Sequence, residues 1–551
     1  MTHRTLAFQL AQALRERGAT EIFGIPGDFA LPLFREFECD AVLPLHTLSH
    51  EPAVGFAADA ASRTRGGLGV AAVTYGAGAL NLVNTVASAY AERVPLVVLS
   101  GAPAAHEAAS GLLLHHQVKS IASQWQLFHE LTADQVRLDD AREAPEAIAR
   151  VLDTALRRSL PVDLEIPRDM PAMPCAAVPR HAPPAPDPDA VAACADELLL
   201  RLRAASRPLL MAGVEVRRFG LESRVAELAR RLALPVVTSF MGRGLLSEHD
   251  APLRGTYLGL AGDADLSAQV ESSDGLLLLG VIVSDTNFAV SAQRIDLRHA
   301  LHVYDDRVRI GHHVYPFVPM AALIDALLDR LPAAAERGAR AKGVPPPVRE
   351  PVRDDSPVAP ADIADAVCAL MRRHGPMPLA SDVGDCLFTA MDIGPAPFIA
   401  PGYYATMGYG VPAGLGVQAS GGRRPIVLVG DGAFQMTGWE LGNAQACGCD
   451  PIVIVFNNHA WEMLRAFEPG AKFNALPHWD FASMAAGMGG EGMRVRTRAE
   501  LHDALETAHA RRGRFQLIDV QIAEGAVSPT LARFVQAVKR LSTPAAKEVS
   551  R

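Results

Sequence analysis

Short apolar runs that alternate with helical patterns along the chain are the feature that most constrains the fold. Examples are "VPLVVLSGAP", "RPLLMAGVEV", "DGLLLLGVIVS" and "RPIVLVGDGAF", each long enough for one buried strand. Strands that are apolar on both faces, with helices between them, are typical of parallel sheets covered by helices on either side. The sequence therefore predicts an α/β protein with doubly wound, mainly parallel sheets, which bind ligands at the carboxyl ends of the strands.

Two proline-rich stretches, 171–189 and 332–360, interrupt this alternation, and we expect them to be extended linkers. They divide the 551 residues into three segments, which we place at 1–170, 190–332 and 358–540. Each segment is large enough to bury a core of its own. The sequence therefore predicts three α/β domains.

Composition excludes several classes of protein. A net charge of −9 with 21 % charged residues favours neither nucleic acid nor an anionic membrane as a partner. The seven cysteines are scattered and form no CxxC pair, so we expect a reducing cytoplasm rather than disulfides or zinc. The N-terminus is typical of an amphipathic helix rather than a signal peptide. "GVAAVTYGAGALNLVNTVASAYA" contains glycines and asparagines, so it predicts a buried strand, turn and helix rather than a membrane span.

The run 424–463 carries the most specific motif. One predicted buried strand ends in GDG at 430–432, a helix follows, and a second buried strand ends in NN at 457–458. Because consecutive parallel strands end at the same edge of a sheet, we expect Asp431 and Asn458 to converge. Their oxygens, with a carbonyl from the following turn, suit Mg²⁺ bound together with a diphosphate at the helix N-terminus. The alternative is that GDG is only a strand-to-helix turn.

This pattern resembles the thiamine diphosphate signature, and the resemblance extends over essentially the whole chain. It is closest to the 2-keto acid decarboxylases, specifically the phenylpyruvate and indolepyruvate decarboxylases, through "FGIPGDFALPLF", "LSHEPAVGFAADA", "GLLLHHQ" and "PGYYATMGYGVPAG". The resemblance implies non-oxidative decarboxylation of an aromatic 2-keto acid to an aldehyde and CO2, with thiamine diphosphate and Mg²⁺ as cofactors. It also implies a pyrimidine-binding domain, a central domain and a diphosphate-binding domain, in that order.

Glu51, the lone acid in "SHEPAVGF", begins a predicted helix, where an acid is usually just a solvated charge beside the helix dipole. The resemblance gives it another role, a hydrogen bond to N1′ of the aminopyrimidine that favours the tautomer able to remove the C2 proton. In the family, different subunits hold the pyrimidine and the diphosphate. Glu51 is therefore expected to work with the Asp431 of a second copy, in a homodimer at minimum and by expectation a homotetramer.

The resemblance also assigns the remaining cofactor contacts. Met407 matches the bulky residue that holds thiamine in its bent shape, although a core methionine is compatible with the same position. Ala405 is expected to accept the pyrimidine amino group on its carbonyl oxygen, and Asp385 to lie near the diphosphate. The expected cofactor-binding residues are Glu51, Asp385, Ala405, Met407, Gly430, Asp431, Gly432, Ala433 and Asn458, and the expected metal ligands are Asp431, Asn458 and Ala460.

Three residues match the family's substrate-handling groups. Asp28 lies in "GIPGDFAL", and His115 and His116 lie in "LLLHHQ". They match the aspartate and paired histidines that orient the keto acid and move protons after CO2 leaves. Two adjacent histidines in a loop are equally typical of a solvated turn, so this assignment depends on the resemblance.

Two positions depart from the pyruvate decarboxylase pattern. Leu464 stands where those enzymes have a glutamate, and Leu387 where they have a tryptophan that caps the pocket. Glu462 is close in sequence, but two residues turn a helix by about 200°, so it should face elsewhere. Asp285 in "LGVIVSDTNF" is a candidate catalytic substitute, and a simple turn aspartate is the alternative. With Leu387, Leu464 and Trp461 as pocket residues, we expect room for an aromatic substrate.

Other functions remain open. Acetohydroxyacid synthases, benzoylformate decarboxylase and oxalyl-CoA decarboxylase share the cofactor motifs, but the histidine pair with Asp28 favours simple keto acid decarboxylation. Branched-chain keto acids stay open because apolar walls do not sharply distinguish an aromatic ring from a branched chain. An inactive scaffold is disfavoured because Glu51 and Asp431 are both present. A nicotinamide dehydrogenase is disfavoured because "GAGALN" lacks the third glycine of GxGxxG. The expected partner is a small keto acid, without nucleic acid or membrane.

Overall fold

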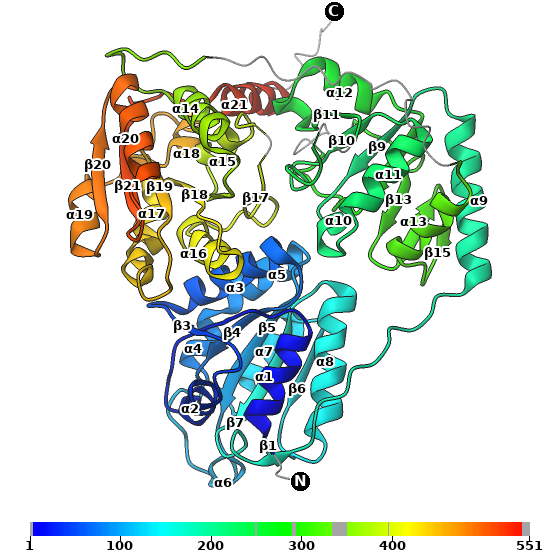
Figure 1. Ribbon diagram of the computed structural model, residues 1–551, viewed down its shortest axis with the longest axis vertical. Coiled ribbons are helices and arrows are strands. Elements are labelled where there is room, and N and C mark those ends of the chain that lie inside the picture. Colours follow the sequence, from blue (N-terminus) through cyan, green and yellow to red (C-terminus); the bar gives the residue numbers. More distant parts are fainter. Residues whose placement is uncertain (1–3, 248–250, 289–293, 333–349, 395, 543–551) are drawn as a thin grey trace, which may run out of the picture.

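The computed structural model describes residues 4–247, 251–288, 294–332, 350–394 and 396–542. These residues form three large sheets with helices packed against them (Figure 1), and a two-stranded antiparallel sheet of β1 (Arg4–Thr5) and β8 (Pro174–Cys175). The domain that begins the chain lies at the bottom of that view, the central domain at the upper right and the last domain at the upper left. The predicted fold class, α/β with three doubly wound sheets, is confirmed.

The first sheet has six parallel strands with helices on both faces. In spatial order they are β3 (Leu45–Thr47), β2 (Ile22–Gly24), β4 (Gly69–Val73), β5 (Leu96–Ala102), β7 (Val162–Pro167) and β6 (Asp134–Arg137). Side chains alternate along a strand, so Val97 and Leu99 pack under one helix layer and Val98 under the other. The first layer is α1 (Leu6–Glu16), α2 (Leu31–Asp40) and α8 (Ala144–Arg158), and the second is α3 (Glu51–Arg65), α5 (Val83–Ala91) and α7 (Ser123–Leu131).

The second sheet has seven strands, and the last two strand pairs in its spatial order are antiparallel. In spatial order the strands are β11 (Leu253–Thr256), β10 (Val236–Thr238), β9 (Pro208–Ala212), β12 (Gly275–Leu279), β13 (Leu301–Tyr304), β14 (Arg307–Ile310) and β15 (His313–Tyr315). Only Asp305 and Asp306 connect β13 to β14, too few residues to return the chain for parallel pairing. Asp305 has φ +51°, as a tight hairpin requires. The sheet is mainly parallel, as the sequence predicts, but this antiparallel extension was not predicted.

The third sheet repeats the topology of the first. Its parallel strands are, in spatial order, β17 (Phe398–Ile399), β16 (Leu379–Ser381), β18 (Ile426–Gly430), β19 (Ile452–Asn457), β21 (Gln516–Gln521) and β20 (Glu491–Val495). When the strands of each sheet are numbered in chain order, both sheets have the order 2-1-3-4-6-5. Ligands of such sheets bind in the crevice where the strand order reverses. The loops after β2 and β4, and after β16 and β18, therefore border the expected sites.

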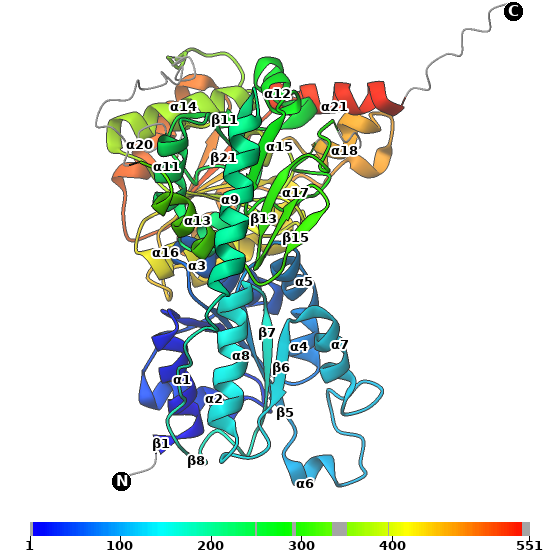
Figure 2. The same ribbon diagram turned by 90° about the vertical axis from the view of Figure 1, so that its right-hand side faces the viewer.

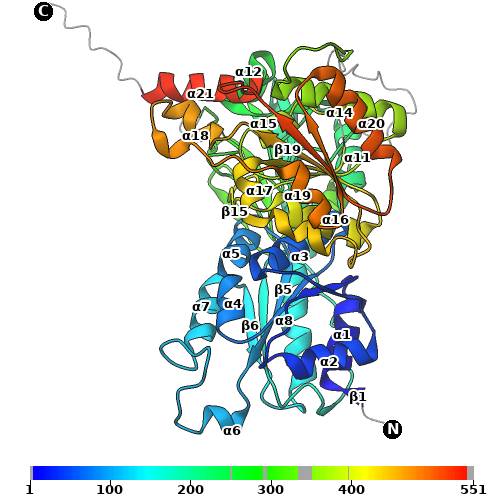
Figure 3. The same cartoon turned by 90° about the vertical axis from the view of Figure 1, so that its left-hand side faces the viewer.

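The first and third domains pack through α3 and α16 (Gly410–Gly421), which lie against each other (Figure 3). A Cβ atom built on Gly416 would lie 2.1 Å from the carbonyl oxygen of Ala57, so glycine permits this close approach. Phe56 and Tyr409 belong to one apolar core that spans both domains. The central domain lies above the first domain and beside the third (Figure 1, Figure 2).

Several local expectations can be compared with the structure. Helix α1 begins after Thr5, whose hydroxyl accepts the N–H of Phe8 at 3.2 Å. The most apolar stretch of the first domain forms β4, α4 (Ala77–Asn81) and α5, as predicted, and all seven cysteines are free. No helix in the described part of the chain is long and apolar enough to cross a membrane. Residues 176–187 contain no regular secondary structure, whereas 333–349 of the second proline-rich stretch lie outside the described residues.

Candidate active site

Asp431 begins α17 (Asp431–Thr437) at the carboxyl end of β18, and Asn458 directly follows the neighbouring strand β19. Asp431 Oδ1 accepts the N–H of the next residue at 2.9 Å, and the N–H groups of Asn458, His459 and Ala460 also interact with the carboxylate. Oδ2 is buried and has no hydrogen-bond partner among the described residues. Burial raises the pKa of Asp431 to about 7, although these N–H groups oppose the shift.

A divalent cation would satisfy this orphaned oxygen and favour the charged carboxylate. Asn458 Oδ1 accepts the N–H of Ala460 at 3.1 Å, and His459 between them has φ +56°, so the three form one tight turn beside Asp431. In the ranges that the structure describes, no three His, Cys, Asp or Glu residues gather as a metal cluster. A metal here must therefore use amide and carbonyl oxygens as well, a set that suits Mg²⁺. The residues fit the expected ion, and their roles as ligands stay predictions.

Trp461 lies against the start of α17. A Cβ atom built on Gly432 would lie 2.0 Å from Cζ3 of Trp461, so this position requires glycine. Gly430 ends β18 and Ala433 is buried in the first turn of the helix. The indole expected in the substrate pocket therefore packs on the turn expected to hold diphosphate.

The loop before α16 carries two of the predicted thiamine contacts. Ala405 has φ +56°, a strained conformation for a residue other than glycine, and Met407 is half-buried against the shared core. Asp382 follows β16, is fully buried, and accepts the N–H groups of Gly408 at 3.1 Å and Gly410 at 2.7 Å. Burial raises the pKa of Asp382 to about 6. Sequence reasoning missed Asp382, because the backbone N–H groups that it accepts carry no sequence pattern.

Asp385 begins α15 (Asp385–Ala390) at the same edge of the sheet. Its Oδ2 accepts the N–H of Ser528 at 2.9 Å, just before α21 (Pro529–Ser542). Its Oδ1 is buried without a hydrogen-bond partner in the described ranges. Burial raises the pKa of Asp385 to about 6, and the nearby charge of Glu462 adds to the shift. One oxygen is therefore committed to the protein, and the other suits a donor from a bound group.

The two departures from the pyruvate decarboxylase pattern lie on different helices. On α18 (Glu462–Phe467), Glu462 is buried and paired with Arg465, whereas Leu464 is 53 % exposed. These side chains face different ways, as predicted. Leu387 lies on α15 and is buried. That Leu387 and Leu464 line a substrate pocket stays a prediction.

Glu51 is the first residue of α3 and is half-buried. Its Oε2 accepts a hydrogen bond from Nδ2 of Asn81 at 2.9 Å, at the end of α4. A Cβ atom built on Gly78 would lie 3.5 Å from Oε1 of Glu51, so α4 borders the carboxylate closely. Sequence reasoning did not identify Asn81 as a partner, because no spacing rule connects it with a residue 30 positions earlier.

Asp28, His115 and His116 come together beyond the carboxyl end of β2. Asp28 Oδ2 is hydrogen-bonded to Nε2 of His115, and Oδ1 is 3.9 Å from Nδ1 of His116. Phe29 stacks on His115 with ring centroids 4.7 Å apart. Burial raises the pKa of Asp28, but the hydrogen bond and charge of His115, with the charge of His116, outweigh it and hold that pKa below its usual range. His115 is 60 % exposed, so this group is open to a substrate.

A buried chain of hydrogen bonds supports the histidine turn. His116 has φ +65°, and its carbonyl oxygen lies 2.0 Å from a Cβ built on Gly76, which has φ +58°. Gln124 accepts the N–H of Gly76 at 2.7 Å and donates to Oε1 of Glu165 at 3.2 Å. Burial raises the pKa of Glu165 to about 7, although the charge of Arg137 opposes the shift. Sequence reasoning missed this chain; the charged residues inside the buried run "VDLEIP" were its signal.

Asp285 lies exposed in the loop after β12. Its Oδ1 accepts the N–H of Thr286 at 2.8 Å, the local interaction expected of a turn aspartate. Within the described ranges, no hydrogen bond or ion pair joins Asp285 to the other site residues. Its role as a substitute for the missing glutamate stays a prediction.

Three family models match the chain, one for each of the three domains. The model of the thiamine pyrophosphate enzyme N-terminal TPP binding domain matches residues 4–127, the central domain matches 195–331, and the C-terminal TPP binding domain matches 382–520. The acid–histidine group lies in the first match and the Asp431 turn in the last. Fold and site together define a thiamine pyrophosphate enzyme.

Relatives of similar length narrow this class. Indole-3-pyruvate decarboxylase of Azospirillum brasilense is 58 % identical over 540 residues, which is 97 % of this chain and 98 % of the relative. Pyruvate decarboxylase 1 of Pisum sativum is 27 % identical over 92 % of this chain and 88 % of the relative. Alpha-keto-acid decarboxylase of Mycobacterium bovis is 28 % identical over 96 % of both chains. The chain therefore belongs to the thiamine diphosphate-dependent 2-keto acid decarboxylases.

Proposed function

We propose that this enzyme decarboxylates an aromatic 2-keto acid, indole-3-pyruvate or phenylpyruvate, to its aldehyde and CO2. The observation that carries the proposal is the 58 % identity to an indole-3-pyruvate decarboxylase over nearly the whole chain. Leu387 and Leu464 support an aromatic substrate because they replace a bulky and an acidic residue by smaller apolar ones. Apolar walls of this kind favour a buried aryl ring over the small methyl group of pyruvate.

The C-terminal domain holds the cofactor in this proposal. Bound thiamine diphosphate supplies a nucleophilic carbon and an electron sink for the bond that breaks as CO2 leaves. Asp431, Asn458 and the carbonyl of Ala460 would hold Mg²⁺ together with the diphosphate. The carbonyl of Ala405 would accept the pyrimidine amino group, and Met407 would pack against the bound thiamine.

The N-terminal domain supplies the acids and bases. Glu51 would hydrogen-bond N1′ of the aminopyrimidine and hold a proton there. Asp28 orients His115 through Nε2, so Nδ1 of that ring is available to hold or donate a proton toward the keto acid. Gln124, supported by Glu165, keeps the turn of His116 in place.

We further propose a cytoplasmic homodimer or homotetramer in which each site combines segment 1–170 of one chain with segment 358–540 of another. Complementation tests this arrangement. Glu51→Gln and Asp431→Ala are each expected to be inactive, but their mixed dimer contains one site with both native residues. Unfolding and refolding the two variants together should restore up to a quarter of the activity. No recovery in verified mixed dimers would place each site within a single chain.

An aldehyde assay tests the substrate assignment. Purified protein with thiamine diphosphate and Mg²⁺ is offered indole-3-pyruvate, phenylpyruvate, benzoylformate, a branched-chain keto acid and pyruvate. We expect the highest kcat/KM for one of the first two. A preference for pyruvate, benzoylformate or the branched-chain acid would overturn the aromatic assignment and leave the family membership intact.

A further inference from the structure

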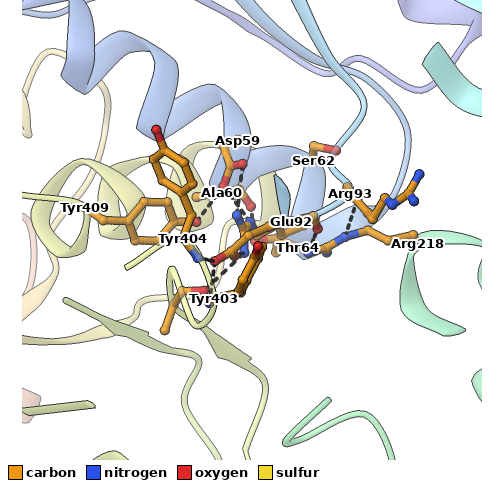
Figure 4. Close-up of polar contacts among 12 residues, drawn as sticks. Asp59, Ala60, Ser62, Thr64, Glu92, Arg93, Arg218, Tyr403, Tyr404 and Tyr409 are labelled. Carbon is orange, nitrogen blue, oxygen red and sulfur yellow. Dashed lines mark hydrogen bonds and ion pairs between the residues drawn. The ribbon is translucent and has the colours of Figure 1, made fainter. Parts of the chain in front are cut away.

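Glu92 connects the first domain to the loop that carries the predicted thiamine contacts (Figure 4). It caps the C-terminal end of α5 and is fully buried. Its Oε1 accepts two backbone N–H groups, from Tyr403 at 2.7 Å and from Tyr404 at 2.9 Å. Its Oε2 accepts Nη1 of Arg63 at 2.6 Å. Both carboxylate oxygens are therefore committed, one to an arginine of its own domain and one to a backbone more than 300 residues away.

Arg63 fixes this carboxylate within a buried ion cluster. It forms a two-point contact with Asp59 on the preceding turn of α3 and donates to the carbonyl of Ala400 at 3.1 Å. Tyr409 donates its hydroxyl to the same Asp59 at 2.7 Å. Burial lowers the pKa of Arg63, but Asp59, Tyr409 and Glu92 raise it well above its usual range. Arg63 is therefore charged, and the cluster holds both ends of the loop, at Ala400 and at Tyr409.

The loop between these ends has a conformation that needs support. Ala405 has φ +56°, which an L-residue adopts only when its surroundings enforce it. Asp382 holds the following backbone, and Asn84 donates to the hydroxyl of Thr406 at 2.9 Å. Before Ala405, the carboxylate of Glu92 holds two consecutive N–H groups. These bonds together determine where the carbonyl of Ala405 points.

The central domain in turn fixes the end of α5. Arg218 of α10 (Glu215–Arg218) donates to the carbonyl of Arg93 at 2.8 Å, and Figure 4 shows this contact beside Glu92. Arg93 lies 3.5 Å from Glu215 of the same helix. The position of Glu92 is therefore set from two domains while its carboxylate acts on the third.

We propose that Glu92 is a positioning residue that orients the carbonyl of Ala405 and the side chain of Met407 toward thiamine diphosphate. This inference rests on the proposed function, because it assigns the loop to the aminopyrimidine. Loss of the carboxylate leaves Arg63 buried with less compensation and frees two N–H groups, so the loop shifts. Small displacements of a positioning element cost as much as about 100-fold in rate.

Two variants of Glu92 test the proposal, together with a matched control. Glu92→Gln keeps the shape but removes the charge, and Glu92→Asp keeps the charge opposite Arg63 but shortens the reach to the loop. The control is Asp450→Asn, a buried carboxylate that also pairs with an arginine, Arg424, and accepts a backbone N–H, from Gly513 at 3.0 Å. Melting temperature, affinity for thiamine diphosphate and hydrogen–deuterium exchange at C2 of the bound cofactor are measured for all three.

We expect both Glu92 variants to weaken thiamine diphosphate binding and to slow C2 exchange by about 10-fold or more, while the control changes only the melting temperature. Wild-type affinity and exchange in Glu92→Asp would overturn the proposal, and so would equal losses in the control. These measurements need no keto acid. A failed aromatic assignment would appear only in the aldehyde assay of the wild type, so the two failures are distinguishable.

Discussion

The first and third sheets share one strand order, yet the acids at their carboxyl ends have pKa values shifted in opposite directions. Asp28, beside the first sheet, is partly exposed, and its histidine partners hold its pKa low. Asp431, at the third sheet, is buried, has one oxygen without a partner among the described residues, and has its pKa raised to about 7. A solvent-accessible, ionised carboxylate such as Asp28 suits a substrate that binds and dissociates in each catalytic cycle. A closed carboxylate that lacks a partner suits a resident ion.

A second difference concerns how each crevice is supported. In the third domain Asp382 directly accepts N–H groups of the loop and first turn that lead into α16. In the first domain Glu165 does not contact the histidine turn. It accepts a hydrogen bond from Gln124, which in turn accepts the N–H of Gly76 beside that turn. Both acids are buried on or directly after a strand and have raised pKa values. The same topology therefore places a buried acid near the carboxyl ends of both sheets. Asp382 contacts its loop directly, whereas Glu165 is linked to its loop through Gln124.

The largest effect is expected from Asp431→Ala. Without this carboxylate the metal and diphosphate lose their buried ligand, so the purified variant should contain no thiamine diphosphate and show no activity. Cofactor content after gel filtration measures this directly. Chelator treatment of the wild type should have the same effect, and Mg²⁺ should reverse it. Full activity in a metal-free preparation would contradict the resident-ion half of the comparison.

Glu51→Gln should act on chemistry rather than on binding. The amide cannot share a carboxylate proton with N1′, so exchange at C2 should slow by about 10²-fold or more, the scale of general acid–base groups. Cofactor content and melting temperature should stay close to those of the wild type. Hydrogen–deuterium exchange at C2 is the measurement, and an unchanged rate would refute the assignment of Glu51.

Asp28→Asn should distinguish most clearly between substrate handling by the first domain and cofactor binding by the third. The neutral amide no longer orients His115 as an ionised acceptor, so kcat should fall by about 10- to 100-fold. Thiamine diphosphate binding and C2 exchange should be unaffected because both depend on other residues. A parallel loss of cofactor would show that the acid–histidine group supports binding, which would break the comparison.

Leu387→Trp should alter selectivity by a smaller factor. A larger side chain on α15 should lower kcat/KM for phenylpyruvate by about 10-fold and affect pyruvate less, by steric exclusion. Leu387→Met is the control, since a flexible side chain of similar volume should preserve both values. Equal losses with both substrates would show that Leu387 does not line the pocket.

The smallest effect concerns the pH dependence of stability. Burial raises the pKa of Glu165 from its usual 4.5 to about 7, so the folded protein binds this proton more tightly than the unfolded chain. Its contribution to stability is present below about pH 4.5 and is lost as the pH rises through about 7. The amide side chain of the Glu165→Gln variant cannot ionise. As the pH rises from 5 to 8, the free energy of unfolding of this variant should therefore fall by about 1–3 kcal/mol less than that of the wild type. Melting temperatures across that range test this, and parallel curves would contradict it.

Regular patterns predicted the parts of the molecule that depend on local spacing. The buried runs around Asp431 and Asn458 predicted two adjacent parallel strands, and the structure brings their ends together. Asp28 and His115 are 87 positions apart and come together in the structure, but no periodicity connects them, so only the family resemblance paired them. The hairpin at Asp305 was missed because a connection of two residues leaves no helical signal.

Side chains that accept backbone N–H groups of a distant segment could not be predicted from the sequence, for a physical reason. Glu92 and Asp382 each accept N–H groups, and every residue except proline has one, so the recipient segment carries no recognisable pattern. Burial of these acids is a property of the packed domains rather than of their own helices and strands. Only the fold shows that Glu92 faces a loop of the third domain.

Gly416 limits which amino-acid substitutions this protein can accept during evolution. Every other amino acid carries a Cβ atom, and at this position that atom would lie 2.1 Å from the carbonyl oxygen of Ala57. Any replacement of the glycine at 416 therefore forces α3 and α16 apart, and α3 begins with Glu51. Because the obstacle is backbone, a smaller side chain at position 57 gives no relief. Divergence in this lineage is thus expected to spread through surface loops and helix exteriors while this crossing stays unchanged.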